Sequence, residues 1–175
     1  MERKPRAKNP VMKAAPPKAD TQRDALILNA VVDSLHSIFE TMLSTKVEMG
    51  APIPKAGRTV QSGVSALIGM NAVEARGSVA ITLPVPALNE ISLKLLGEEI
   101  KVVDLDAAGL AGELSNMLAG VAKRILSEQG LDFDMQTPQM MHGDGHEIAH
   151  HHDGQTMLLP VKMNGHEFFV ELNFV

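Results

Sequence analysis

A glutamate and an asparagine, Glu113 and Asn116, stand three residues apart in a segment of good helix formers that runs from Leu110 to Gly130. Side chains at positions i and i+3 are neighbours on a helix surface, so the carboxylate and the carboxamide lie close together. The same segment contains Gly112 and Gly120, although each interior glycine costs a helix about 1 kcal/mol relative to alanine. We expect Gly112 to permit close packing and Gly120 to leave room beside Asn116 for an incoming partner.

Helical periodicity predicts that this pair faces solvent, because the other faces of the helix are apolar or small. The apolar stripe predicted to be buried consists of Leu110, Leu114, Met117, Leu118, Val121 and Ile125. A strip of small residues is formed by Ala108, Gly112, Ser115, Ala119 and Ala122. The face opposite the apolar stripe carries Glu113, Asn116, Gly120, Lys123 and Ser127.

Composition excludes several classes of protein. A chain of 175 residues with 45% hydrophobic residues is long and apolar enough for one globular domain. The absence of cysteine excludes disulfides, Fe–S clusters and a thiol nucleophile, and it fits a cytoplasmic protein. No apolar run approaches the roughly 20 residues that span a bilayer, and no apolar segment follows the basic N-terminus, so we expect neither a membrane span nor a signal peptide.

Charge divides the chain in two. Residues 1–20 contain six Lys and Arg, are rich in Pro and Ala, and show no hydrophobic periodicity, so we predict a disordered basic tail. Residues 21–175 are predicted to form a single domain. That domain is acidic, since the whole chain has a net charge of −5, and it lacks Trp and Tyr. These properties argue against a nucleic-acid-binding domain.

Hydrophobic periodicity and turn residues predict the order of elements. The expected elements are a helix (21–43), a short strand and loop (46–57), two hairpin strands (63–70 and 77–85), helices at 86–97 and about 106–130, and strands at 132–143, 155–165 and 167–175. The Asn164-Gly165 pair predicts a hairpin between the last two strands. A helix followed by three strands occurs twice. We therefore predict an α+β fold with pseudo-twofold symmetry: a six-stranded, mostly antiparallel sheet with the long helices on one face.

The segment GELSNMLAGVAKRIL, around Glu113 and Asn116, resembles the Glu-x-x-Asn helix of the CheX/CheC/FliY chemotaxis phosphatases. The resemblance is best to CheX, and it extends from about Asp24 to Val175. It includes the segments SALIGMNAVEARGSVAITLP, LKLLGEE and GLDFDMQTPQMMHG. It implies the two-layer CheC/CheX-like fold, in agreement with the periodicity.

The resemblance also implies a function, which is hydrolysis of the aspartyl phosphate on a CheY-like response regulator. Asn116 would position the attacking water, because a carboxamide both accepts and donates hydrogen bonds. Glu113 would form a salt bridge with the active-site lysine of the receiver domain. Mg²⁺ would be supplied by the receiver, so the chain would need no cofactor or metal of its own.

Two further expectations follow from the family. Asn29 has Leu26, not glutamate, three residues before it, so we expect one active site per chain. The family implies a homodimer and a receiver domain as partner, whereas composition predicts neither a nucleic-acid nor a membrane partner. The alternative is a non-enzymatic adaptor of the same fold that binds a response regulator or a flagellar-switch component.

A histidine-rich segment, His142–Asp153, contains five of the seven histidines of the chain and three acidic residues. Imidazole and carboxylate are suitable Zn²⁺ or Ni²⁺ ligands, so a metal site is one interpretation. We favour a solvated, glycine-rich loop, because the adjacent His150, His151 and His152 cannot all point at one ion without a distorted backbone.

Overall fold

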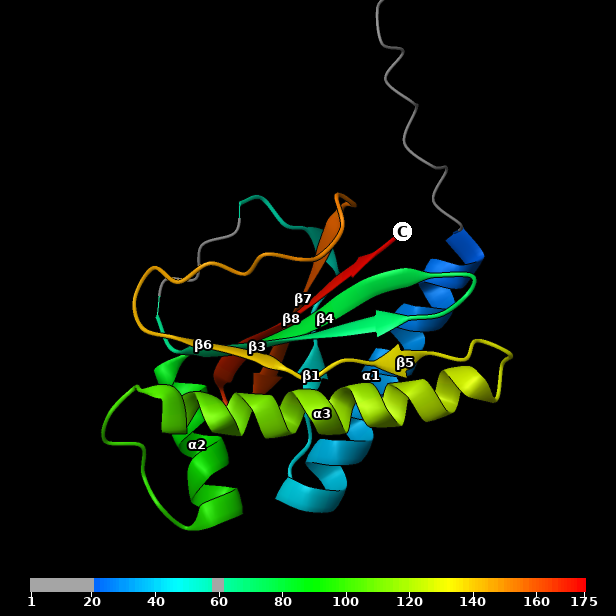
Figure 1. The fold of residues 1–175 in the computed structure, drawn as a ribbon. Helices are drawn as coiled ribbons and strands as arrows, with labels where there is room; N and C mark the ends of the chain where they lie inside the picture. The colour runs from blue at the N-terminus through cyan, green and yellow to red at the C-terminus, as the bar shows by residue number, and fades with distance from the viewer. Residues whose placement is uncertain (1–20, 58–61) are drawn as a thin grey trace, which may run out of the picture.

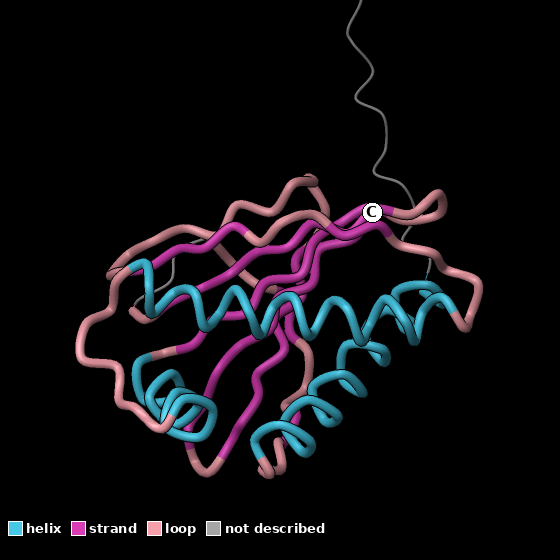
Figure 2. Tube along the Cα trace, turned by 60° about the horizontal axis from the view of Figure 1, so that its bottom comes forward, coloured by secondary structure: helices cyan, strands magenta, loops and turns pink. Residues whose placement is uncertain are grey.

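Two layers make up the protein in this computed structural model, which describes residues 21–57 and 62–175. One layer is a β-sheet, and the other consists of three helices packed against one face of it (Figures 1 and 2). The predicted tail, residues 1–20, lies outside the described residues, so the proposed division into a tail and one domain stays a prediction. The predicted α+β class, with the helices on one face, is confirmed.

The sheet contains eight strand segments, whereas the sequence predicts six strands. The segments are β1 (Glu48–Met49), β2 (Ile53–Pro54), β3 (Val64–Asn71), β4 (Arg76–Leu83), β5 (Asp134–Met135), β6 (Gln139–His142), β7 (Thr156–Met163) and β8 (His166–Phe174). Both β1 and β2 pair with β7, and both β5 and β6 pair with β3, so the eight segments occupy six positions. Pro52 and Pro138 lie in the interruptions, where a proline cannot donate to the ladder.

The order across the sheet, β1-β7-β8-β4-β3-β5, confirms the predicted pseudo-twofold arrangement. Each half of the chain supplies a long helix, an interrupted edge strand and a hairpin. The interrupted strand of each half pairs with the hairpin of the other half, and β4 pairs with β8 at the centre. All pairs are antiparallel. The predicted Asn164-Gly165 turn joins β7 to β8, and both residues have the positive φ that a type I′ turn requires, 49° and 81°.

The first helix, α1 (Thr21–Leu43), has the predicted bounds. Its buried residues include Ile27, Val31, Leu35 and Ile38, which recur at intervals of three or four. By length and composition alone, α1 is apolar enough to cross a membrane, which the sequence-based expectation of no such segment did not anticipate. In the structure its apolar stripe packs against α3 and the sheet, as expected of a core helix.

The other two helices have identifiable ends. In α2 (Val85–Leu96), Pro86 lies in the first turn and Gly97 forms a left-handed C-cap, as predicted. In α3 (Leu105–Ser127), the Asp104 carboxylate accepts a hydrogen bond from the backbone N–H of Ala107 at 2.9 Å. The predicted end of α3 at Gly130 is too late by three residues. Gly130 belongs to the turn after the helix, in which its N–H donates to the carbonyl of Ser127.

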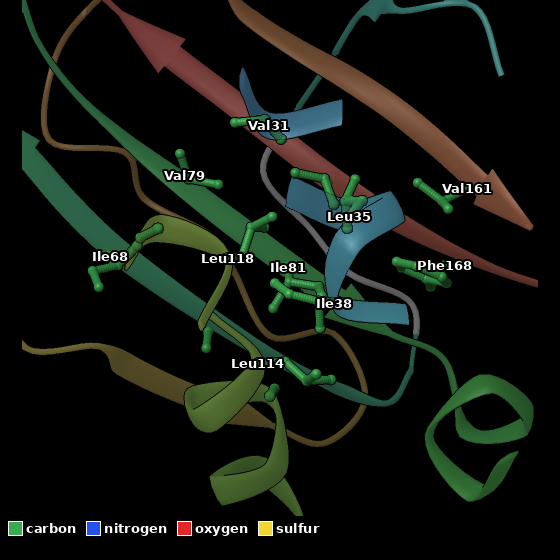
Figure 3. Close-up of a cluster of buried hydrophobic side chains, with 14 of the residues drawn as sticks. Val31, Leu35, Ile38, Ile68, Val79, Ile81, Leu114, Leu118, Val161 and Phe168 are labelled. Atoms are coloured by element: carbon green, nitrogen blue, oxygen red, sulfur yellow. The ribbon is translucent and has the colours of Figure 1, made fainter. Parts of the chain in front are cut away.

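The core lies between the helices and the sheet, and side chains from both halves of the chain meet there (Figure 3). The rings of Phe39 on α1 and Phe168 on β8 are stacked, with centroids 5.1 Å apart. Leu114 and Leu118 of α3 approach the same cluster as Ile81 of β4 (Figure 3). The motif helix is therefore anchored by the core on one side.

The central β4–β8 pair generates a prediction about stability. A Cβ added at Gly77 would lie 2.1 Å from the backbone oxygen of Asn173 and 2.5 Å from the ring of Phe174. Gly77→Ala should therefore force the two halves apart and destabilise the protein by about 1–3 kcal/mol, the usual cost of overpacking. Thermal unfolding followed by circular dichroism measures the loss. Gly120→Ala is a matched control, because its Cβ would meet nothing within 4 Å. An unchanged midpoint for Gly77→Ala would contradict the β4–β8 register, in which Gly77 is paired with Phe174.

Candidate active site

The rotation of α3 is set by its small residues. All five members of the predicted small strip are buried: Ala108, Gly112, Ser115, Ala119 and Ala122. In the predicted apolar stripe, Leu110, Leu114 and Leu118 are buried, whereas Met117, Val121 and Ile125 are only partly buried. The small strip, not the large apolar residues, is thus the most deeply buried face. The reason is that α3 lies directly on β3, β4 and β6 while α1 packs along its side.

Glu113 and Asn116 are both exposed on the remaining face of α3. This helix runs along the outside of the helical layer (Figure 1). Across residues 21–57 and 62–175, neither side chain forms a hydrogen bond or an ion pair. The structure therefore brings the two predicted residues together on one surface and leaves their polar atoms available to a partner.

The two glycines beside the pair have different surroundings. A Cβ at Gly112 would lie 2.9 Å from the sulfur of Met140 on β6, so glycine permits the close packing expected there. A Cβ at Gly120 would meet nothing within 4 Å, in agreement with the expectation of free space near Asn116. Gly112 thus allows close packing inside the protein, whereas Gly120 borders open space.

An exposed carboxylate beside an exposed carboxamide has a limited chemistry. The carboxylate can bind a cation such as the ammonium group of a lysine, and the carboxamide can accept from a water molecule while donating to an anion. Within the part of the chain that the structure describes, no side chain forms a hydrogen bond or ion pair with Glu113 or Asn116 that could activate a nucleophile. Such a site suits a reaction in which another molecule supplies the reactive group.

The interpretation of the His142–Asp153 segment as a solvated loop is wrong for two of its histidines. In Figure 1 this loop runs above the sheet, on the face opposite the helices. The two imidazole nitrogens of His146 lie 2.7 Å from the carbonyl oxygen of Gly143 and 2.8 Å from Oγ of Ser65. Ile148 is buried against Leu67 and Ala80 of the sheet. The loop is therefore fastened to the sheet by hydrogen bonds and by an apolar contact.

His150 belongs to a buried polar network on the same face. Its Nδ1 lies 2.7 Å from Oγ of Ser78, and its Nε2 lies 3.0 Å from a carboxylate oxygen of Glu171. The other carboxylate oxygen of Glu171 accepts from Nζ of Lys55 at 2.5 Å. Ser78 has no exposed surface, so this Ser-His-Glu arrangement is structural and offers no accessible nucleophile.

Sequence reasoning missed this network, because Lys55 and Glu171 are 116 residues apart. One signal was available: alternation along β8 places Glu171 and Asn173 on the face opposite Val170 and Leu172. Among the described residues, no three His, Asp or Glu side chains converge as metal ligands. Two histidines of the segment, His146 and His150, are hydrogen-bonding partners of sheet residues.

Comparison with known proteins identifies relatives along most of the chain. A family model described as chemotaxis phosphatase CheX matches residues 64–162. The chain is 36% identical to a CheC-like superfamily protein from Shewanella sp. PV-4. The match covers 86% of this chain and 97% of the Shewanella chain, and the two structures superpose with a TM-score of 0.77. For a chemotaxis protein CheX from Vibrio vulnificus, the identity is 35%, the coverages are 85% and 99%, and the TM-score is 0.76.

A more distant similarity is to a CheX–CheY–BeF₃–Mg²⁺ complex from Borrelia burgdorferi. It has 22% identity, coverages of 85% and 97%, and a TM-score of 0.69, so it shows the shared fold. No match was found among curated protein sequences.

The buried network generates a prediction about the histidine-rich loop. His150→Ala removes a partner from both Ser78 and Glu171, and an unsatisfied buried polar group costs about 1–3 kcal/mol. Its thermal midpoint should fall, by roughly 2–4 °C for each kcal/mol in a protein of this size. His151→Ala is the matched control, because His151 is exposed and should leave the midpoint unchanged. Equal midpoints for both variants would show that the loop does not depend on His150.

Proposed function

The chain belongs to the CheX family of chemotaxis phosphatases, and from that premise we propose that it hydrolyses the aspartyl phosphate of a CheY-like response regulator. The observation that carries the proposal is the placement of Glu113 and Asn116 as exposed, unpaired neighbours on α3. The complex of CheX with CheY from Borrelia burgdorferi supports a partner of this type. The proposed reaction takes place in the cytoplasm, where receiver domains are found.

In the proposed reaction this chain only positions the attacking water and the receiver. The receiver carries the phosphoryl group on its aspartate and holds Mg²⁺, which neutralises charge on the phosphoryl oxygens. The oxygen of a water molecule attacks phosphorus, the bond between phosphorus and the aspartyl oxygen breaks, and the carboxylate and inorganic phosphate are released. The side-chain oxygen of Asn116 accepts a hydrogen bond from the water, and its NH₂ group donates to a phosphoryl oxygen. The water is thereby held in line with the bond that breaks.

Glu113 has a separate role as the anchor. Its carboxylate forms a salt bridge with the active-site lysine of the receiver, and this contact sets the position of the neighbouring carboxamide. An ion pair at an interface is strongest when the partners exclude water. Because the contact exists before and during the reaction, it contributes to binding as well as to turnover.

The proposed oligomeric state is also taken from the family. We propose a homodimer formed through sheet edges, which in this fold are the interrupted strands β1–β2 and β5–β6. One active site per chain then gives two sites per dimer. Sedimentation equilibrium over a range of protein concentrations tests this assembly, and a monomer at all concentrations would contradict it.

The first prediction from the proposed mechanism concerns Asn116. Asn116→Ala should lower kcat for phosphate release by about 10²-fold, because a polar group positioned at the reacting water is lost. The Kd for the phosphorylated receiver should change little, since water positioning matters chiefly in the transition state. Phosphate release from an excess of phosphorylated receiver with Mg²⁺ measures kcat. If the wild type binds the receiver but leaves its phosphate lifetime unaltered, the protein is an adaptor and not a phosphatase.

The second prediction concerns Glu113. Glu113→Ala should weaken binding of the receiver and also reduce turnover, because the lost salt bridge is present in both states. Glu113→Asp keeps the charge but shortens the reach, so it should recover only part of the activity. Both variants should keep the wild-type thermal midpoint, since substitutions at exposed positions stay within about 0.5 kcal/mol. An unfolded Glu113→Ala variant would show that the pair is structural.

A further inference from the structure

Two partly buried glycines, Gly109 and Gly120, flank the exposed Glu113–Asn116 pair on α3, each one helical turn away. Building on the proposed function, we propose that Gly109 and Gly120 determine how closely the receiver approaches α3, and thereby whether Asn116 reaches the phosphoryl group. The sequence between them reads GLAGELSNMLAG, so a glycine precedes Glu113 by four residues and another follows Asn116 by four. The spacing between glycine and functional residue is therefore four residues on each side of the pair.

Helix geometry places these four residues on one narrow strip. At 3.6 residues per turn, Gly109 and Gly120 fall between Glu113 and Asn116 when the helix is viewed along its axis. The strip extends over twelve residues, and the eleven steps between its ends span roughly 16 Å at 1.5 Å per residue. Along this length the two glycines contribute no side chain. The carboxylate and the carboxamide therefore rise from a strip that is bare on both sides.

Neither packing nor backbone conformation within the protein requires glycine at position 109 or 120. A Cβ added at Gly109 or Gly120 would meet nothing within 4 Å, and neither residue has a positive φ. The other glycines on helices differ: Gly112 lies under Met140, and Gly97 caps α2 in the left-handed conformation. Alanine would stabilise the helix at both positions, because its helix propensity is higher and its Cβ would meet no neighbouring atom. Glycine at positions 109 and 120 therefore lowers the stability of the free protein, so we look for its function in the contact with a partner.

The short side chain of Asn116 gives a physical reason for glycine at these two positions. Asparagine is one of the shorter polar side chains, so its carboxamide reaches a water molecule in another protein only if the helix backbone comes close. A side chain on the next turn of the same strip would contact the receiver first and hold the helix away. Misplacement of a catalytic group by about 1 Å can cost as much as 10²-fold in rate. Bare turns on both sides allow the receiver to close over the strip without such a contact.

The test combines two measurements on the full chain that should move in opposite directions. Gly109→Ala and Gly120→Ala should each raise the thermal midpoint by about 2–4 °C, because alanine stabilises a helix interior relative to glycine. The same variants should lower kcat/KM for dephosphorylation by about 10-fold or more, and Gly109→Leu and Gly120→Leu should lower it further. The substrate is a CheY-like receiver from the same cell, phosphorylated with acetyl phosphate in Mg²⁺. A parallel titration with the beryllofluoride-bound receiver gives the Kd.

Gly112→Ala is the matched control for the helix, because the same methyl group there would lie 2.9 Å from the sulfur of Met140, which would have to move, so the midpoint should rise less than it does for the variants at positions 109 and 120. The inference is overturned if the alanine and leucine variants at positions 109 and 120 keep wild-type kcat/KM and Kd. A wild type that binds the receiver without hydrolysing its phosphate would refute the phosphatase, while weaker binding by the glycine variants would still support the approach distance. A wild type that neither binds nor hydrolyses refutes both proposals.

Discussion

Close packing of α3 on the sheet is the constraint on which the site depends. Small residues on the buried face, with Gly112 beneath Met140, hold this helix near the strands and fix its rotation. Because α1 covers a second side, only a narrow face of α3 stays in contact with solvent. Glu113 and Asn116 occupy that face. A larger residue in the small strip would move or rotate the helix, and with it the pair.

The exchange of strands between the two halves makes this platform continuous. Each interrupted edge strand pairs with the hairpin of the other half, and β4 and β8 join the halves at the centre. The strands beneath α3 include β3 and β4 from the first half and β6 from the second. The position of the motif helix therefore depends on segments from the whole length of the domain. Neither half could present the helix in this way by itself.

The two faces of the sheet are stabilised by different interactions. The face toward the helices is apolar and forms the main core. On the opposite face, Lys55 and His150 both contact the buried carboxylate of Glu171, and the histidine-rich loop covers part of the surface. Buried charges need partners to compensate for lost hydration, and here the two partners of Glu171, Lys55 and His150, come from separate segments of the chain. The proposed catalytic pair lies on α3, on the helical side, and the buried carboxylate of Glu171 lies on the opposite face of the sheet.

Local patterns in the sequence determined the helices, the hairpins and the pairing of Glu113 with Asn116, because periodicity, caps and i, i+3 spacing act over a few residues. The repeat of a helix and three strands likewise indicated the pseudo-twofold sheet. Only the tertiary structure decided which strands exchange between halves, where prolines interrupt the edges, and how His150 meets Glu171. Those contacts join residues far apart in the chain, and no local pattern encodes a partner at such a distance. The open space beside Gly120 and the burial of Gly112 were settled in the same way, since the difference lies in what packs against each one.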